Sequence, residues 1–277
     1  METRRIAFGD VELSCNELEG PAPPLVLLHG FTGHRDDFRT CMPDLAELCR
    51  LLAPDLRGHG DFTRTGRRET FSFARLVEDL AAVLDACDVE RCHLLGHSFG
   101  GMVALRFVLA HPERIASLIL MDTAPFSPEA FSPAAFAKGG EIARARGMAF
   151  LQELVERAAR GDERSGASDR QRDKWSDVYW PHHRRRHLAM DPVGYGELGK
   201  VMVEQAPVTA RLAEIRTPTT VLVGDEDEEF LAGADALASG IPEAVRVTLP
   251  DAGHHPQMES PEAWLAAVRE HLRRVAG

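Results

Sequence analysis

The stretch from Gly96 to Gly101, GHSFGG, constrains the fold of this chain more than any other. It follows a short apolar run over residues 91–95 with strand character and leads into residues 102–110, which have helix character. A tight strand-to-helix turn centred on Ser98 would expose its hydroxyl above the end of a sheet. Glycine is needed on both sides because strand and helix approach too closely there for a Cβ atom. The pattern predicts an α/β architecture and makes Ser98 a candidate nucleophile.

Runs with strand and helix character alternate along most of the chain. This alternation predicts a mostly parallel central sheet with helices on both faces. A length of 277 residues is sufficient for such a sheet together with an insertion. Amphipathic spacing predicts helices between the strands, including one over residues 38–49. We expect strands at residues 11–18, 25–28, 50–54, 91–95, 115–121, 219–224 and 244–249.

The alternation stops between residues 125 and 207, where helical stretches occur without a strand-like run. We therefore expect a sheet core in residues 1–124, an inserted helical cap in residues 125–207, and the rest of the core in residues 208–277. Aromatic side chains of the cap are expected to line an apolar substrate cleft. The candidates for that lining are Phe126, Trp175 and Trp180.

The segment from Pro181 to His187 carries three arginines and three histidines. It lacks acidic or thiolate companions at the spacing of a metal site and is short for an anion-binding patch, so we expect a solvated helix face. The formal net charge of -11 argues against nucleic acid and anionic membrane surfaces as partners, since both need a basic face. No metal and no cofactor are expected, and nothing in the sequence predicts an oligomeric state.

The cysteines and the N-terminal residues point to the cytoplasm. The chain has five cysteines, an odd number without C-x-x-C spacing, so we expect reduced and mostly buried thiols. No apolar segment follows the N-terminal arginines, and no apolar run approaches the roughly 18 residues of a membrane span. The cysteines are Cys15, Cys41, Cys49, Cys87 and Cys92.

Ser98 needs partner residues if it is a nucleophile, whereas a glycine-rich turn that only packs a helix predicts none. The loop after the last strand carries His254 and His255, where a histidine can meet Ser98 across the carboxyl ends of the sheet. Residues 225–229 are five consecutive acids after a strand, which usually mark a solvated helix start but can include an orienting acid. Serine, acid and histidine in this order are what a G-x-S-x-G hydrolase fold requires.

A loop with glycines around a bulky residue, Gly30 to Gly33, follows another central strand. Such a loop can turn its N–H groups toward a ligand. We assign the N–H groups of Phe31 and Phe99 as an oxyanion hole, with an ordinary loop as the alternative. His59 lies in a Gly-His-Gly turn, where an imidazole more often makes a local hydrogen bond than takes part in catalysis.

Taken together, these residues resemble the α/β-hydrolase family, in its serine-nucleophile branch with a helical cap. The resemblance implies that the acid stands three residues after the glycine that ends its strand, which selects Asp227 over Asp225. A less common arrangement in the family would use Asp122, at the end of the preceding core strand. The family's histidine directly follows Ala-Gly, which selects His254 over His255. The motifs that carry the resemblance are residues 29–31, 55–60, 96–101, 224–227 and 252–254.

The resemblance implies a serine hydrolase that cleaves a small-to-medium carboxylic ester, carboxylesterase-like, with a Ser98, His254 and Asp227 triad. Its expected partner is a small-molecule apolar ester substrate. Enol-lactonases, thioesterases and cofactor-free perhydrolases share the fold and stay open as alternatives. A slow-turnover ligand receptor is a further alternative, which a turnover measurement would distinguish.

Three positions bear on other branches of the family. The dehalogenase and epoxide-hydrolase branches carry aspartate where this chain has Ser98, which argues against both. Carbon–carbon bond hydrolases commonly carry asparagine at the position of His97 and tryptophan at that of His255. Both departures weigh against carbon–carbon bond cleavage, which nevertheless stays open as an alternative.

Overall fold

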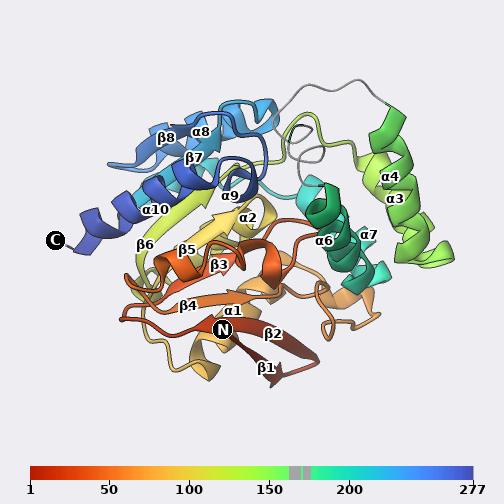
Figure 1. The fold of residues 1–277 in the computed structure, drawn as a ribbon, viewed down its shortest axis with the longest axis horizontal. Coiled ribbons are helices and arrows are strands. Elements are labelled where there is room, and N and C mark those ends of the chain that lie inside the picture. The colour runs from red at the N-terminus through yellow and green to blue at the C-terminus, as the bar shows by residue number, and fades with distance from the viewer. Residues whose placement is uncertain (162–169, 171–175, 277) are drawn as a thin grey trace.

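A computed structural model describes residues 1–161, 170 and 176–276 of the chain. Its strands within these residues are β1 (Glu2–Phe8), β2 (Val11–Leu18), β3 (Leu25–Leu28), β4 (Leu51–Pro54), β5 (Cys92–His97), β6 (Ile115–Met121), β7 (Thr219–Gly224) and β8 (Val245–Leu249). They form one sheet in the order β1-β2-β4-β3-β5-β6-β7-β8 (Figure 1). Neighbours from β4 to β8 are parallel, whereas β2 pairs antiparallel with both β1 and β4. The expected mostly parallel sheet is confirmed.

Helices cover both faces of this sheet. The helices of the sheet core are α1 (Phe73–Ala86), α2 (Phe99–Ala110), α8 (Glu228–Gly240), α9 (Pro256–Glu259) and α10 (Pro261–Ala276). Successive residues of a strand point to opposite faces. Val26 and Leu28 of β3 therefore pack in a layer with α1, α2 and α8, whereas Leu25 and Leu27 pack in a layer with Trp264 of α10. Because β3 is buried on both faces, its sequence is a continuous apolar run.

The expected helix over residues 38–49 is absent, and this prediction was wrong. Two short 3-10 helices, η1 (Arg35–Phe38) and η2 (Pro43–Leu45), occupy this part of the chain. Pro43 lacks the N–H that a continuous helix needs at this point, which separates the two turns. The apolar spacing nevertheless predicted correctly which side chains are buried. Phe38 and Met42 are fully buried in the layer that contains Trp264.

The insertion expected over residues 125–207 lies between β6 and β7, and the described secondary structure of these residues is helical. Its helices are α3 (Pro133–Arg146), α4 (Met148–Gly161), α6 (Ser176–Ala189) and α7 (Pro192–Val203). They gather on the right in Figure 1, beside the sheet. Helices α3 and α7 approach very closely at Gly140 and Gly196. A Cβ on Gly140 would lie only 2.7 Å from the Cα of Gly196.

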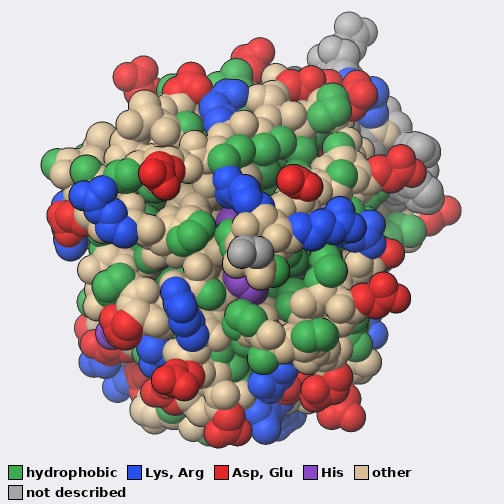
Figure 2. Space-filling model, turned by 90° about the vertical axis from the view of Figure 1, so that its left-hand side faces the viewer, with side chains coloured by type: hydrophobic (Ala, Val, Ile, Leu, Met, Phe, Trp, Pro, Cys, Tyr) green, Lys and Arg blue, Asp and Glu red, His purple; other side chains and the backbone are tan. Residues whose placement is uncertain are grey.

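On the face shown in Figure 2, acidic and basic side chains are interspersed with apolar ones, and no large patch carries charge of one sign. None of the helices in the described residues is long and apolar enough to cross a membrane. All five cysteines are buried and unbridged.

Candidate active site

Ser98 lies in the turn between β5 and α2, with φ 52° and ψ −118°. A residue other than glycine rarely adopts this positive φ, so the surrounding structure must hold the turn. The Ser98 N–H donates to the carbonyl of Met121 at 2.9 Å, and the Thr123 hydroxyl donates to the carbonyl of Ser98 at 2.6 Å. A Cβ on Gly96 would lie 2.6 Å from the Gly100 carbonyl oxygen, which explains the first glycine of the motif.

The turn brings Ser98 to the two side chains that the sequence paired with it. The Nε2 atom of His254 lies 3.0 Å from the Ser98 hydroxyl oxygen, and its Nδ1 lies 2.9 Å from a carboxylate oxygen of Asp227. His254 follows β8, Asp227 follows β7, and the histidine ring stacks on Phe230 of α8 with 4.8 Å between centroids. Asp225 instead accepts the Ala252 N–H. The three residues can therefore pass a proton from the serine to the imidazole.

His254 and Asp227 each stabilise the charged form of the other. Burial alone would lower the pKa of His254, but the charge and hydrogen bond of Asp227 raise it above its ordinary value. Burial alone would raise the pKa of Asp227, but the charge and hydrogen bond of His254, with a hydrogen bond from Asp122, lower it. Asp227 therefore stays ionised at neutral pH and stabilises a protonated His254.

Asp122, the other acid considered from the sequence, is fully buried at the end of β6 with φ 45°. Its Oδ1 accepts the Gly224 N–H at 2.9 Å, and its carboxyl lies within hydrogen-bonding reach of Asp227. Burial first, and then repulsion from Asp227, raise the pKa of Asp122 well above its ordinary value. Burial therefore favours the protonated form of Asp122, in which it can donate a hydrogen bond to Asp227, and its described partners do not include His254.

The N–H groups of Phe31 and Phe99 have no hydrogen-bond partner among the described residues. Phe99 is the first residue of α2, so its N–H also lies at the positive end of the helix dipole. Phe31 lies in the loop after β3, and the next N–H, that of Thr32, donates to Nε2 of His59 at 3.2 Å. The Nδ1 of His59 lies 3.2 Å from the Arg57 carbonyl, so the expectation of a local hydrogen bond for His59 is confirmed.

A cavity of about 170 Å³ opens above the Ser98 hydroxyl. Phe126 and Trp180 are not among the residues that line it, and Trp175 lies outside the described residues. Phe126 packs against the core, and Trp180 packs on Tyr179 and His183 of its own helix. The lining consists of Gly30, Phe31, Thr32, Gly33, Asp37, His97, Ser98, Arg186, His254 and His255.

The basic segment of α6 is not a fully solvated helix face, so that prediction was wrong in part. His183, Arg186 and His187 are buried, whereas Arg184 and Arg185 are exposed. One side of α6 packs on α4 and η1. The spacing of apolar residues within α6 alone does not predict this packing. Two side-chain contacts hold it there: His182 Nε2 lies 2.7 Å from Asp37 Oδ1, and His183 Nδ1 lies 3.0 Å from Gln152 Oε1.

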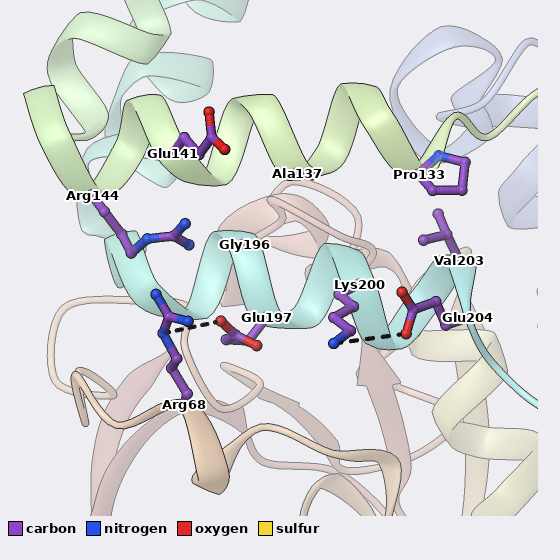
Figure 3. A pocket seen from close by; sticks show the side chains of 10 residues that line it. All are labelled: Arg68, Pro133, Ala137, Glu141, Arg144, Gly196, Glu197, Lys200, Val203 and Glu204. Atoms are coloured by element: carbon purple, nitrogen blue, oxygen red, sulfur yellow. Dashed lines mark ion pairs between the residues drawn. The ribbon is translucent and has the colours of Figure 1, made fainter.

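A second hollow, of about 340 Å³, lies between α3 and α7 (Figure 3) and shares no lining residue with the cavity above Ser98. Four of its charged side chains pair locally, Arg68 with Glu197 at 3.5 Å and Lys200 with Glu204 at 3.9 Å. Within the described part of the chain, no group of three or more His, Cys, Asp or Glu residues could hold a metal ion.

The sequence and the fold both match known proteins. Residues 23–261 match the family model of the alpha/beta hydrolase fold. A putative 2-succinyl-6-hydroxy-2,4-cyclohexadiene-1-carboxylate synthase of Bacillus subtilis is 27% identical over 263 residues, covering 93% of each chain. A 2-hydroxy-6-oxononadienedioate/2-hydroxy-6-oxononatrienedioate hydrolase of Cupriavidus pinatubonensis is 29% identical, covering 95% of this chain and 92% of its own. A malate-bound thermophilic esterase from Thermogutta terrifontis superposes with a TM-score of 0.82 at 28% identity, covering 99% of each chain.

Proposed function

The chain belongs to the α/β-hydrolase family, and on that premise we propose that it is a serine hydrolase that cleaves a small-to-medium carboxylic ester. One observation carries the proposal: His254 joins the Ser98 hydroxyl, at 3.0 Å, to the carboxylate of Asp227, at 2.9 Å. A serine hydroxyl is a weak nucleophile at neutral pH and needs such a base. The esterase from Thermogutta terrifontis adds support through its likeness over 99% of the chain.

In the proposed reaction, His254 takes the proton of Ser98 as the serine oxygen attacks the ester carbonyl. The N–H groups of Phe31 and Phe99 stabilise the resulting oxyanion, each contributing roughly 10² to 10³ in rate. His254 then gives its proton to the departing alcohol, and an acyl-enzyme remains. Water, activated by His254 in turn, releases the acid. Asp227 holds the imidazole in the required tautomer throughout.

We further propose that the insertion acts as a cap over this site and that an apolar part of the ester lies against Phe31. The Phe31 ring lines the cavity and lies 5.5 Å from the Phe136 ring and 5.2 Å from the Tyr195 ring, between centroids. These two partners come from α3 and α7, so aromatic side chains of core and insertion meet beside the nucleophile. In this proposal they replace Phe126 and Trp180 as the apolar wall.

The test is hydrolysis of p-nitrophenyl esters from acetyl to dodecanoyl, with Ser98→Ala as the blank. We expect kcat/KM of about 10⁴ M⁻¹s⁻¹ or more for the best ester and none above the blank for Ser98→Ala. The chain-length optimum would measure the apolar part of the site. Equal turnover by Ser98→Ala, or no turnover by the folded wild type, would contradict the proposal.

Carbon–carbon bond hydrolysis is the second candidate. The observation that favours it is the relative from Cupriavidus pinatubonensis, a 2-hydroxy-6-oxononadienedioate hydrolase similar over 95% of this chain. His97 and His255 weigh against it, because they stand where such enzymes commonly have asparagine and tryptophan. The test is Ser98-dependent cleavage of a 2-hydroxy-6-oxodienoate, measured as the loss of the substrate's absorbance. Such cleavage without ester turnover would favour this candidate over the first.

A further inference from the structure

Arg186 brings a positive charge from the insertion into the cavity above Ser98. It lies on α6, is only 6% exposed, and lines this cavity together with Ser98 and His254. His255 lines the same cavity, where burial first, and then the charge of Arg186, lower its pKa well below its ordinary value. The proposed ester-cleaving reaction does not use this charge.

A buried guanidinium is costly unless its donors are paired. The nearest carboxylate is that of Asp37, whose Oδ2 lies 3.7 Å from Arg186 Nη1, farther than a hydrogen bond. The oxygens of Asp37 already accept from His182 Nε2 at 2.7 Å and from the His34 N–H at 3.1 Å. The Nε of Arg186 has no hydrogen-bond partner in the described residues.

Two other buried arginines show what a satisfied guanidinium looks like in this protein. Arg57 makes two hydrogen bonds of 2.7 Å to the carboxylate oxygens of Asp79. Arg35, whose Nε is also without a hydrogen-bond partner among the described residues, bonds the carboxylate of Asp55 through Nη1 at 2.5 Å and that of Asp61 through Nη2 at 3.1 Å. Arg186 is as buried as Arg35 and lacks such a partner among the described residues. The difference is that Arg186 faces a cavity that a ligand can enter.

We infer that Arg186 binds a carboxylate of the substrate, so that the ester cleaved at Ser98 is a half-ester that carries a second, ionised carboxyl group. The planar guanidinium matches a carboxylate with two parallel hydrogen bonds. Arg186 lines the cavity and makes no hydrogen bond to a described residue, so a carboxylate that enters the cavity can bind its guanidinium and also lie beside neutral His255. This inference rests on the proposed function and narrows its substrate class.

The inference is tested with two methyl esters that differ in one group. Monomethyl glutarate carries a free carboxylate, and methyl glutaramate has an uncharged amide of the same shape in its place. Released methanol measures both reactions. We expect the wild type to prefer the carboxylate ester in kcat/KM, and Arg186→Gln to lower kcat/KM for that ester by about 10- to 100-fold while changing the amide ester less than about threefold.

Two variants of the same helix act as controls. Arg185 is the neighbour of Arg186 but is exposed and lies 3.4 Å from Asp36, so Arg185→Gln should leave both rates within about twofold. Arg186→Lys keeps the charge without the planar fork and should recover part of the preference for the carboxylate ester. Equal losses with both esters in Arg186→Gln would overturn the inference and leave the proposed function standing.

A binding measurement makes the inference independent of turnover. Glutarate is titrated calorimetrically into Ser98→Ala and into Ser98→Ala with Arg186→Gln. Binding that is at least tenfold weaker in the double variant supports the carboxylate site, even if no ester is cleaved and the proposed function fails. Equal binding in both proteins, or no binding in Ser98→Ala, would overturn the inference.

Discussion

The imidazole Nε2 of His97 lies 2.7 Å from the carbonyl oxygen of His254. A carbonyl oxygen only accepts, so Nε2 of His97 carries the proton and donates it. Burial first, and then the nearby positive charge of His254, lower the pKa of His97 to about 3, which keeps the ring neutral. The residue before the nucleophile thus holds the backbone of the proposed base, and the strand β5 and the loop after β8 are joined at the site.

His97 should therefore act as a positioning residue. We expect His97→Ala to lower kcat by about tenfold or more with little change in KM, because the loop loses a hydrogen bond that orients His254. His97→Gln can donate to the same carbonyl and should retain most of kcat. Steady-state kinetics on the best p-nitrophenyl ester measures both values. A rise in KM at unchanged kcat would instead indicate that His97 contacts the substrate.

Asp122 should be replaceable by its neutral analogue. The raised pKa of Asp122 means that the folded protein holds a proton that the unfolded chain releases above about pH 4, so this group destabilises the fold as pH rises. Asp122→Asn removes that contribution. We expect the variant to gain stability relative to wild type as pH rises above about 4 in urea unfolding.

Activity distinguishes the two roles considered for Asp122. As a neutral donor to Asp227, it should tolerate asparagine with kcat/KM within about threefold of wild type. A loss of about 10³-fold or more would identify Asp122 as the ionised acid of the triad instead.

The pH dependence of activity should reflect His254. A base must be neutral to accept the Ser98 proton, so activity appears as pH rises through the pKa of His254. Asp227 raises that pKa above its ordinary value of 6.5, and we expect the acid limb of kcat/KM at or above this pH. In Asp227→Asn the limb should move to lower pH, because the stabilising charge is gone. A limb that does not move would contradict the contact between the two residues.

Asp227 and Asp225 offer a matched pair of carboxylates. Asp227→Asn should lower kcat by about 10³- to 10⁴-fold, because His254 loses its correct tautomer. Asp225→Asn should stay within about twofold, since Asp225 is exposed and accepts only the Ala252 N–H. Comparison of kcat at pH 8 tests the assignment. Equal losses in the two variants would contradict it.

The tight nucleophile turn should not tolerate a methyl group. A Cβ on Gly100 would lie 2.5 Å from the carbonyl oxygen of His29, so Gly100→Ala should cost about 3 kcal/mol of stability and most activity. Gly9→Ala is the control, because Gly9 has φ +55° with nothing within 4 Å. It should cost only about 1 kcal/mol, from backbone strain, and leave kcat unchanged. Similar effects of the two changes in urea unfolding and kinetics would contradict this account.

Much of the fold was predictable because its signals are local. Ile115–Met121 and Thr219–Gly224 match the strands predicted from their apolar runs residue for residue. Ser98 and its glycines likewise predicted a turn from a few neighbouring positions. The helix expected over residues 38–49 failed because its apolar spacing reports which side chains are buried, and Pro43 prevents them from forming one helix.

The sequence by itself determined the order of the elements, the nucleophile turn and the succession of serine, acid and histidine at strand ends. These features follow from short-range sterics, hydrophobic periodicity and the common edge at which parallel strands end. Only the tertiary structure decided that Asp122 lies against Asp227 and that Arg186 faces the cavity above Ser98. The burial of a side chain depends on which distant segment packs against it, and no local pattern encodes that. Burial in turn decides the charge state of Asp122 and the need of Arg186 for a partner.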